Sequence, residues 1–293
     1  MSAVPPPTAQ SSAAADRGRN IGALLIDAGR LSAEDAEKVL RLQKERDLRF
    51  GDAALQLKLL TEDDIRFALS RQFDYPYLPA GDQSLSQELV AAYRPFTGPV
   101  ERLRALRSQL MLRWFDGAPE RKALAVVSPG NGDGRSFIAA NLAIVFSQLG
   151  ERTVLVDADM RKPRQHALFH LGNHSGLSDV IAGRAGPEAV VRIPSLLGLS
   201  VLPAGAPPPN PQELLGRPAF VELLLGLGKN FDTIIIDTPA TDDCADAQTV
   251  AARAGAAMIV ARKNLTLAGE LLELTRSLQQ SGVELVGSAL NDA

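Results

Sequence analysis

The fold is decided by ALAVVSPGNGDGRSF, residues 123–137, which has the pattern of a short strand, a glycine-rich loop and the start of a helix. Gly130, Gly132 and Gly134 let backbone amides turn inward without Cβ clashes, and the following helix adds the positive end of its dipole. Ser136 supplies a hydroxyl suited to magnesium. The stretch therefore predicts a loop that cradles phosphate groups.

This loop departs from the usual phosphate-binding pattern at two positions. Strict Walker A spacing requires glycine at 129 and lysine at 135, and the chain has Pro129 and Arg135. Arginine keeps the positive charge, but its wide planar head folds over phosphates less readily than an ammonium group. We expect a bound nucleotide to contact Gly130, Asn131, Gly132, Asp133, Gly134, Arg135, Ser136, Phe137 and Arg262.

Short runs of Val, Ile and Leu recur along the rest of the chain and alternate with helical segments. Such runs are typical of a parallel sheet that is buried on both faces. They cover residues 123–127, 153–157, 199–203, 232–237, 256–261 and 283–290. The sequence therefore predicts an α/β fold, a P-loop NTPase with a mostly parallel sheet flanked by helices.

Two of these runs end in carboxylates, Asp157 in VLVDADMR and Asp237 in IIIDTP, and Asp159 follows the first. Parallel strands bind ligands at their carboxyl ends, where a magnesium nucleotide needs hard oxygen ligands and a phosphoryl acceptor needs a base. A single aspartate there is usually a turn residue or a helix cap. Three of them beside a glycine loop predict a magnesium–nucleotide site.

An internal repeat precedes this domain. The segment that begins at Ile21 is echoed from Phe50 at an offset of 29 residues, and Ser32 and Thr61 occupy matching helix N-cap positions. Each copy is therefore expected to be a helix pair, and together they predict a small helical N-terminal domain over 19–80. Residues 1–18, rich in Pro, Ser and Ala, are expected to be a disordered tail.

The repeat resembles the N-terminal domain of type II secretion and pilus assembly ATPases. Some members bind cyclic di-GMP through an Arg-Leu-Gly opening of each repeat, and guanidinium groups suit phosphates and purines. Here the second copy opens with Arg49-Phe50-Gly51, and the first with Asn20-Ile21-Gly22 beside Arg19. Cyclic di-GMP binding through Arg19 and Arg49 is one interpretation of the domain, and a protein-docking module is the other.

Between the two domains, residues 81–98 have no clear apolar period and are interpreted as a linker before a P-loop domain at 99–293. The helix that follows carries Glu101, Arg104 and Arg107 on one flank. Taken alone, these three residues indicate a solvated charged face.

Composition restricts the function further. A net charge of -3 and 5% aromatic residues disfavour nucleic acid as the partner. Cys244 is the one cysteine, so no intrachain disulfide can form and a buried, unreactive thiol is expected. The sequence has neither an apolar run of about 18 residues nor a signal peptide. A cytoplasmic protein is expected, recruited to the inner face of the membrane by a partner.

Residues 99–293 resemble the bacterial tyrosine kinase family, within the MinD-like P-loop ATPases, and especially its exopolysaccharide chain-length-determinant members. The resemblance is distributed along the whole domain and keeps the family's order. It is carried by Glu101, Arg104 and Arg107, the phosphate loop, DADMRKPRQHALF at 157–169, GLSDVIAG at 176–183, LPAGAPPPNPQELL at 202–215, and FDTIIIDTP followed by Asp246-Ala247.

The resemblance implies ATP and Mg²⁺ as cofactors and a role for each site residue. Ser136, Asp157 and Asp237 would ligate magnesium, with Asp157 also a candidate base towards a tyrosine hydroxyl. Asp159 would support the metal's water shell, and Arg135 would meet the phosphates. The resemblance reinterprets Glu101, Arg104 and Arg107 as the motif that assembles family members into homo-oligomeric rings. A separate transmembrane polysaccharide co-polymerase would be the partner.

Other candidate residues carry weaker patterns. The family's tyrosine-rich tail has no counterpart after the last strand, and Tyr75, Tyr77 and Tyr93 are interpreted as packing or linker residues. The histidines recur every four residues but are interpreted as solvated or capping rather than as metal ligands. They are His166, His170 and His174. The acidic loop of Asp242, Asp243 and Asp246 is interpreted as a solvated turn.

Three function classes follow. The first is an ATP-dependent protein-tyrosine kinase that controls polysaccharide chain length, polymerisation and export. The second is a non-catalytic or slowly hydrolysing nucleotide-dependent regulator, responsive to cyclic di-GMP. The third is a positioning ATPase of the MinD or ParA type, which uses a further lysine early in the loop; the chain has no lysine from 123 to 161.

Overall fold

The structure, a computed structural model, describes residues 20–72, 77–79, 81–242 and 244–292. The chain divides into two units, Met1–Pro79 and Ala80–Ala293. The tail expected at 1–18, together with Arg19 and Tyr75, lies outside the described residues.

The first unit contains two helix pairs, as the repeat predicts. The helices are α2 (Ile21–Asp27), α3 (Ala33–Arg46), α4 (Phe50–Gln56) and α5 (Glu62–Gln72). Both predicted N-caps are present: the Ser32 hydroxyl accepts the Asp35 amide at 3.0 Å, and the Thr61 hydroxyl accepts the Asp64 amide at 3.2 Å. Leucines, alanines and Val39 at helical spacing form the core between the helices.

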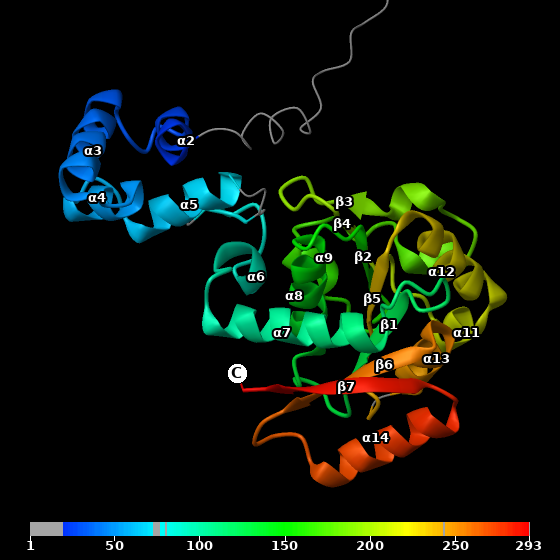
Figure 1. Ribbon diagram of the computed structural model, residues 1–293. Helices are drawn as coiled ribbons and strands as arrows, with labels where there is room; N and C mark the ends of the chain where they lie inside the picture. Colours follow the sequence, from blue (N-terminus) through cyan, green and yellow to red (C-terminus); the bar gives the residue numbers. More distant parts are fainter. Residues whose placement is uncertain (1–19, 73–76, 80, 243, 293) are drawn as a thin grey trace, which may run out of the picture. The chain divides into compact units, whose positions relative to one another are not determined.

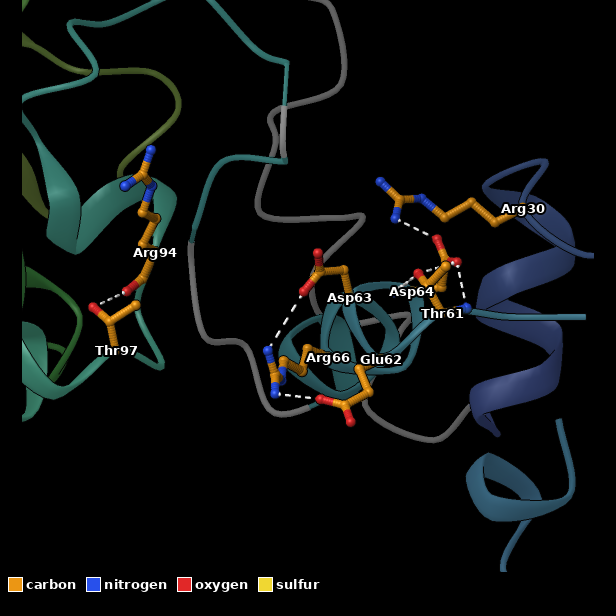
Figure 2. A network of polar contacts seen from close by, with 8 residues as sticks. All are labelled: Arg30, Thr61, Glu62, Asp63, Asp64, Arg66, Arg94 and Thr97. Atoms are coloured by element: carbon orange, nitrogen blue, oxygen red, sulfur yellow. Dashed lines mark hydrogen bonds and ion pairs between the residues drawn. The ribbon is translucent and has the colours of Figure 1, made fainter. Parts of the chain in front are cut away.

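Arg30 ties the two repeats together inside this unit. Its guanidinium donates to Asp64 at 2.8 Å and lies 4.1 Å from the centre of the Phe67 ring. Asp64 also accepts the backbone amide of Thr61 at 2.9 Å, so the cap of α5 and the ion pair form one network (Figure 2). The turn after α2 is thereby fixed to the start of α5.

The second unit is built on a seven-stranded sheet in the order β3-β4-β2-β5-β1-β6-β7. The strands are β1 (Ala123–Val127), β2 (Thr153–Asp157), β3 (Val191–Arg192), β4 (Leu199–Leu202), β5 (Thr233–Asp237), β6 (Ala256–Arg262) and β7 (Glu284–Asn291). All neighbours pair in parallel except the short edge strand β3. The six predicted strands and the mostly parallel sheet are confirmed; β3 is too short to show a pattern in the sequence.

Helices cover both faces of this sheet. They are α6 (Val90–Tyr93), α7 (Gly98–Arg113), α8 (Arg135–Ser147), α9 (Gln165–Leu168), α10 (Leu177–Ile181), the 3₁₀ turn η1 (Pro187–Ala189), α11 (Pro211–Gly216), α12 (Pro218–Asn230), α13 (Asp246–Ala254) and α14 (Ala268–Gln280). Figure 1 shows α7 and α14 on opposite sides of β7. Within the described ranges, no helix has both the length and the apolar character needed to cross a bilayer.

Residues 81–98 are not the linker expected from the sequence. They belong to the second unit, and Leu85, Leu89 and Tyr93 are buried. The segment has no regular period because side chains of α8 satisfy its backbone: Asn141 accepts the Ala91 amide, and Gln148 donates to the Ala91 carbonyl, both at 2.9 Å. Such partners, 50 or more positions away, leave no local pattern.

The same segment ends at the start of α7. The hydroxyl of Thr97, the N-cap residue, donates to the carbonyl of Arg94 at 2.9 Å (Figure 2). The Tyr93 hydroxyl donates to the Leu85 carbonyl at 2.8 Å and accepts the Leu85 amide at 3.1 Å. Tyr93 is therefore a packing residue, as expected.

Candidate active site

The sheet order brings the predicted site residues to one edge. Strand β5 lies between β2 and β1, and Asp157 and Asp237 are register partners on β2 and β5. The glycine-rich loop leaves the end of β1 and leads into α8. Since carboxyl ends of parallel strands share an edge, the two carboxylates lie beside the loop, as the sequence predicts.

Glycine is required at two loop positions, Gly132 and Gly134, where φ is +83° and +96°. Side chains other than hydrogen rarely tolerate this conformation. A Cβ at Gly134 would also come within 2.2 Å of the side-chain nitrogen of Asn291, at the end of β7. The end of β7 therefore packs closely against the loop at the residue before α8.

Gly134→Ala is expected to lower the free energy of unfolding by about 1–3 kcal/mol, through backbone strain, and to weaken ADP binding at least tenfold. Gly150→Ala is the matched control, because its φ of +101° imposes similar strain while a Cβ there meets nothing within 4 Å. Urea unfolding and titration with a fluorescent ADP would measure both. Equal ADP affinities in the two variants would contradict the prediction.

Arg135, expected to meet the phosphates, directs its guanidinium into the loop. Only 6% of the residue is exposed. Its Nε donates to the Thr238 carbonyl at 2.9 Å, and one terminal nitrogen donates to the Gly130 carbonyl at 2.7 Å and to the Ser128 hydroxyl. Arg135 therefore stabilises the loop through hydrogen bonds to its acceptors, and it is also among the residues that line the cavity.

Asp133, also expected to contact nucleotide, is a second brace. It is 1% exposed, and its carboxylate accepts the Gly130 amide at 2.8 Å and the Thr266 hydroxyl at 2.7 Å. The Gly130 amide is therefore engaged by the protein. Arg262 makes a further hydrogen bond to the loop, donating to the Gly132 carbonyl at 3.1 Å.

In front of the loop lies a cavity of about 440 Å³, within the size range of ligand pockets. It is lined by Glu88, Asn131, Gly132, Gly134, Arg135, Ser136, Phe137, Asp159, Lys162, Arg164, Arg262 and Asn291. Gly130 and Asp133 do not line it. Sequence reasoning missed Glu88, Lys162, Arg164 and Asn291, although the last three follow or end parallel strands.

Asp157 and Asp237 are completely buried and do not line this cavity. Asp157 accepts three backbone amides, from Asp159, Arg164 and Gln165, at 2.9–3.2 Å. Burial and the neighbouring charge of Asp237 nevertheless hold the pKa of Asp157 well above its usual value. Burial also raises the pKa of Asp237 to about 6, against hydrogen bonds from Gln165 and Ser136 and the charge of Arg135.

Two buried side-chain oxygens have no hydrogen-bond partner among the described residues: Oδ1 of Asp237 itself and Oε1 of Gln165, which is hydrogen-bonded to both aspartates. An unsatisfied buried acceptor is costly, so these atoms fit a cation and its waters. No three His, Cys, Asp or Glu side chains of the described chain converge as a metal centre. Magnesium is usually held by one or two carboxylates together with nucleotide phosphates.

Of the three predicted site aspartates, Asp159 is the one that lines the cavity. It is 5% exposed, and its Oδ1 accepts the amides of Arg161 and Lys162 at 3.1 and 2.8 Å. The turn after β2 thus holds Asp159 at the cavity wall, whereas Asp157 is completely buried and does not line the cavity.

The acidic loop after β5 differs from the solvated turn expected. Asp242 is exposed and Asp243 lies outside the described residues, but Asp246 is completely buried. Its carboxylate accepts the Arg161 guanidinium at 2.8 and 3.2 Å. A buried carboxylate needs such a cation, and the partner comes from a strand end 85 residues away.

On α7, the three predicted oligomerisation residues are engaged within the chain. Arg104 pairs with Glu101, and Arg107 donates to the Val145 carbonyl of α8 at 2.6 Å. Cys244 is half-buried, and burial raises the pKa of its thiol, as expected for an unreactive cysteine. In the first unit, Arg49 is the N-cap residue of α4 and makes no side-chain cap.

Known proteins resemble this chain in sequence and fold. No family model matches it. CapB of Staphylococcus aureus, named as a tyrosine-protein kinase, is 33% identical over 191 residues, covering 65% of this chain and 83% of CapB. EpsB of Ralstonia solanacearum, also named as one, is 36% identical over 205 residues, covering 70% of this chain.

The chain spans about a quarter of the length of EpsB, 27%. Among solved structures, the kinase domain of the Escherichia coli tyrosine kinase ETK superposes with a TM-score of 0.67 at 29% identity. The superposition covers 75% of this chain and 89% of that domain.

Proposed function

Because the chain belongs to the bacterial tyrosine-protein kinase family, we propose that its second unit transfers phosphate from ATP to tyrosine side chains and so regulates exopolysaccharide chain length, polymerisation and export. One observation carries the proposal. A buried pair of carboxylates, Asp157 and Asp237, lies beside a glycine-rich loop and leaves an oxygen without a donor. That arrangement suits a magnesium nucleotide.

Ser136, Asp157 and Asp237 would hold magnesium, with the nucleotide's phosphates as further ligands. When bound, the ion neutralises charge that develops on the transferred group. The loop amides and the helix start of α8 bind phosphate, while Lys162 and Arg262 add positive charge at the cavity wall. Arg135 keeps the loop in shape from inside.

We assign proton acceptance from the tyrosine hydroxyl to Asp159 rather than to Asp157. Asp159 lines the cavity, whereas Asp157 is completely buried and engaged by three backbone amides. A base must come within hydrogen-bond reach of the proton that it removes, which favours a carboxylate that lines the cavity. The other carboxylate that lines it, Glu88, is paired with Arg164 at 2.9 Å.

The partner we propose is a separate transmembrane polysaccharide co-polymerase, which would recruit the chain to the inner face of the membrane. We also propose a homo-oligomer assembled through α7. Glu101 is 61% exposed on that helix, and its pairing with Arg104 presents both charges together on one flank. Family resemblance supports both proposals.

The test is incubation with magnesium and labelled ATP, alone and with the cytoplasmic segment of a candidate co-polymerase. Phosphotyrosine on either chain, identified by mass spectrometry, is the expected result. Nucleotide-dependent oligomerisation without phosphotransfer would favour the alternative, a nucleotide-dependent regulator. The Asp159→Asn variant should bind ADP and transfer no phosphate.

A second function is proposed for the first unit, which we infer binds cyclic di-GMP. The openings of the two repeats meet at a cavity of about 550 Å³, lined by Asn20, Gly22, Phe50 and the side chains of Gln43 and Gln72, among others. The aromatic ring and the amides suit a purine, and Arg49 beside Phe50 suits a phosphate.

Calorimetric titration of the full chain with cyclic di-GMP tests this second function. Binding with micromolar affinity is expected. Absence of heat at high ligand concentration would reject it in favour of the protein-docking alternative.

A further inference from the structure

Gln165, the first residue of α9, has no exposed surface although it carries a polar amide. Buried polar groups are retained where they are hydrogen-bonded, and a glutamine is seldom completely buried. The contacts of this side chain therefore indicate what the residue does.

These contacts reach three parts of the candidate active site. The backbone amide of Gln165 donates to Asp157 Oδ2 at 2.9 Å. Its side-chain Nε2 donates to Asp237 Oδ2 at 2.7 Å and to the Ser136 carbonyl at 3.1 Å. Both partners of Nε2 are acceptor oxygens, so the amide must present its nitrogen to them. One residue thus joins the ends of β2 and β5 to the first turn of α8.

The other half of the amide is unsatisfied. Gln165 Oε1 is buried and has no donor among the described residues, and the same holds for Asp237 Oδ1. Two acceptors without donors require either a cation or hydrogen-bond donors. Magnesium supplies both, because it keeps several waters when a protein binds it.

We propose that Gln165 is a positioning residue for magnesium, an assignment that rests on the proposed nucleotide site. Its nitrogen holds Asp237 by Oδ2, so that Oδ1 is left for the ion. Its Oε1 accepts a hydrogen bond from the ion's water shell. Partners of this kind beyond the direct ligands contribute about 10–100-fold to metal affinity.

The test uses Gln165→Met in the full chain, which keeps the length of the side chain and removes both polar atoms. ADP affinity is measured by calorimetry in EDTA and over a range of magnesium concentrations. In EDTA, the variant should bind ADP within about twofold of the wild-type affinity. The magnesium concentration for half-maximal enhancement of ADP affinity should rise at least tenfold.

Gln148→Met is the matched control. Gln148 is also a buried glutamine of this unit, and its amide donates to the Ala91 carbonyl at 2.9 Å, on α6. Its loss should lower stability and leave the magnesium dependence of ADP binding unchanged. If Gln165→Met does not fold, Gln165→Asn serves instead, because it keeps an amide that is too short to reach Asp237.

The outcomes separate the two proposals. A wild-type chain that binds no ADP overturns the nucleotide site itself. A wild-type chain that binds ADP, with a Gln165 variant of unchanged magnesium dependence, overturns the positioning role alone. An equal loss of affinity with and without magnesium assigns Gln165 to folding of the site and likewise overturns the positioning role.

Discussion

Asp237→Asn is expected to lower magnesium-dependent phosphotransfer by about a thousandfold. The carboxylate is completely buried, and its Oδ1 is one of two oxygens at the site without a donor. Charge stabilisation by a bound metal is worth several kcal/mol, and each 1.36 kcal/mol is a factor of ten in rate. Asparagine keeps the shape of the side chain and removes the charge.

Without metal, the same substitution is expected to stabilise the protein. Burial raises the pKa of Asp237 from 3.8 to about 6, so the folded chain holds a proton that the unfolded chain has released. The contribution of Asp237 to stability is therefore fully present below about pH 4 and is lost as pH rises through about 6. At 1.36 kcal/mol per pKa unit, Asp237→Asn should be up to about 3 kcal/mol more stable than wild type at pH 7.

Urea unfolding in EDTA at several pH values would measure this difference. Asp232→Asn is the matched control at the other end of β5. The guanidinium of Arg152 holds the pKa of Asp232 below its usual value, so that variant should lose stability relative to wild type as pH rises. An Asp237→Asn variant that is less stable than wild type at pH 7 in EDTA would contradict the prediction.

Sequence patterns were sufficient for the elements whose signals are local. Each predicted strand is a short run rich in apolar residues, largely buried in every case except the edge strand β7, so local composition located it. The caps at Ser32 and Thr61 need only three residues each. The position of the site at the carboxyl ends of the strands could be predicted because parallel strands share that edge of the sheet. The glycines, Asp157 and Asp237 were therefore placed correctly relative to one another.

Features that depend on distant partners could not be predicted. From the sequence, Asp246 is one more acidic residue in a turn. Its burial depends on an ion pair with Arg161, which lies 85 positions earlier in the chain. The segment 81–98 lacks a period because Asn141 and Gln148 bind its backbone. Gln165 lies within the motif at 157–169, yet nothing in its sequence neighbours shows that it is buried and hydrogen-bonded to both Asp157 and Asp237.

Arg135 was correctly placed in the loop from the sequence, but its hydrogen-bond partners could not be predicted. The motif places it at the phosphates, because a lysine there would reach over them. Two acceptors of the loop, the Gly130 carbonyl and the Ser128 hydroxyl, and the carbonyl of Thr238 directly after β5 instead accept hydrogen bonds from the guanidinium. A planar fork with several donors can satisfy three acceptors at once, which an ammonium group does less well.

Arg135→Met is therefore expected to cost about 3–5 kcal/mol of the free energy of unfolding, since it leaves two carbonyls and a hydroxyl without their charged donor, each loss costing about 1–3 kcal/mol. ADP affinity should fall at least a hundredfold, because the loop no longer holds its shape. Arg135→Lys keeps the charge and loses the fork, so it should cost only about 1–2 kcal/mol. Its ADP affinity should stay within about tenfold of the wild-type value.

The order of stability of wild type, Arg135→Lys and Arg135→Met distinguishes a residue that stabilises the loop from one that only binds phosphate. If Arg135 braces the loop, stability falls from wild type to Arg135→Lys to Arg135→Met even in the absence of nucleotide. If it served only the phosphates, all three would unfold at the same urea concentration without ADP and differ only with it. Urea unfolding in EDTA with and without ADP separates the two cases, and equal midpoints without ADP would overturn the bracing role.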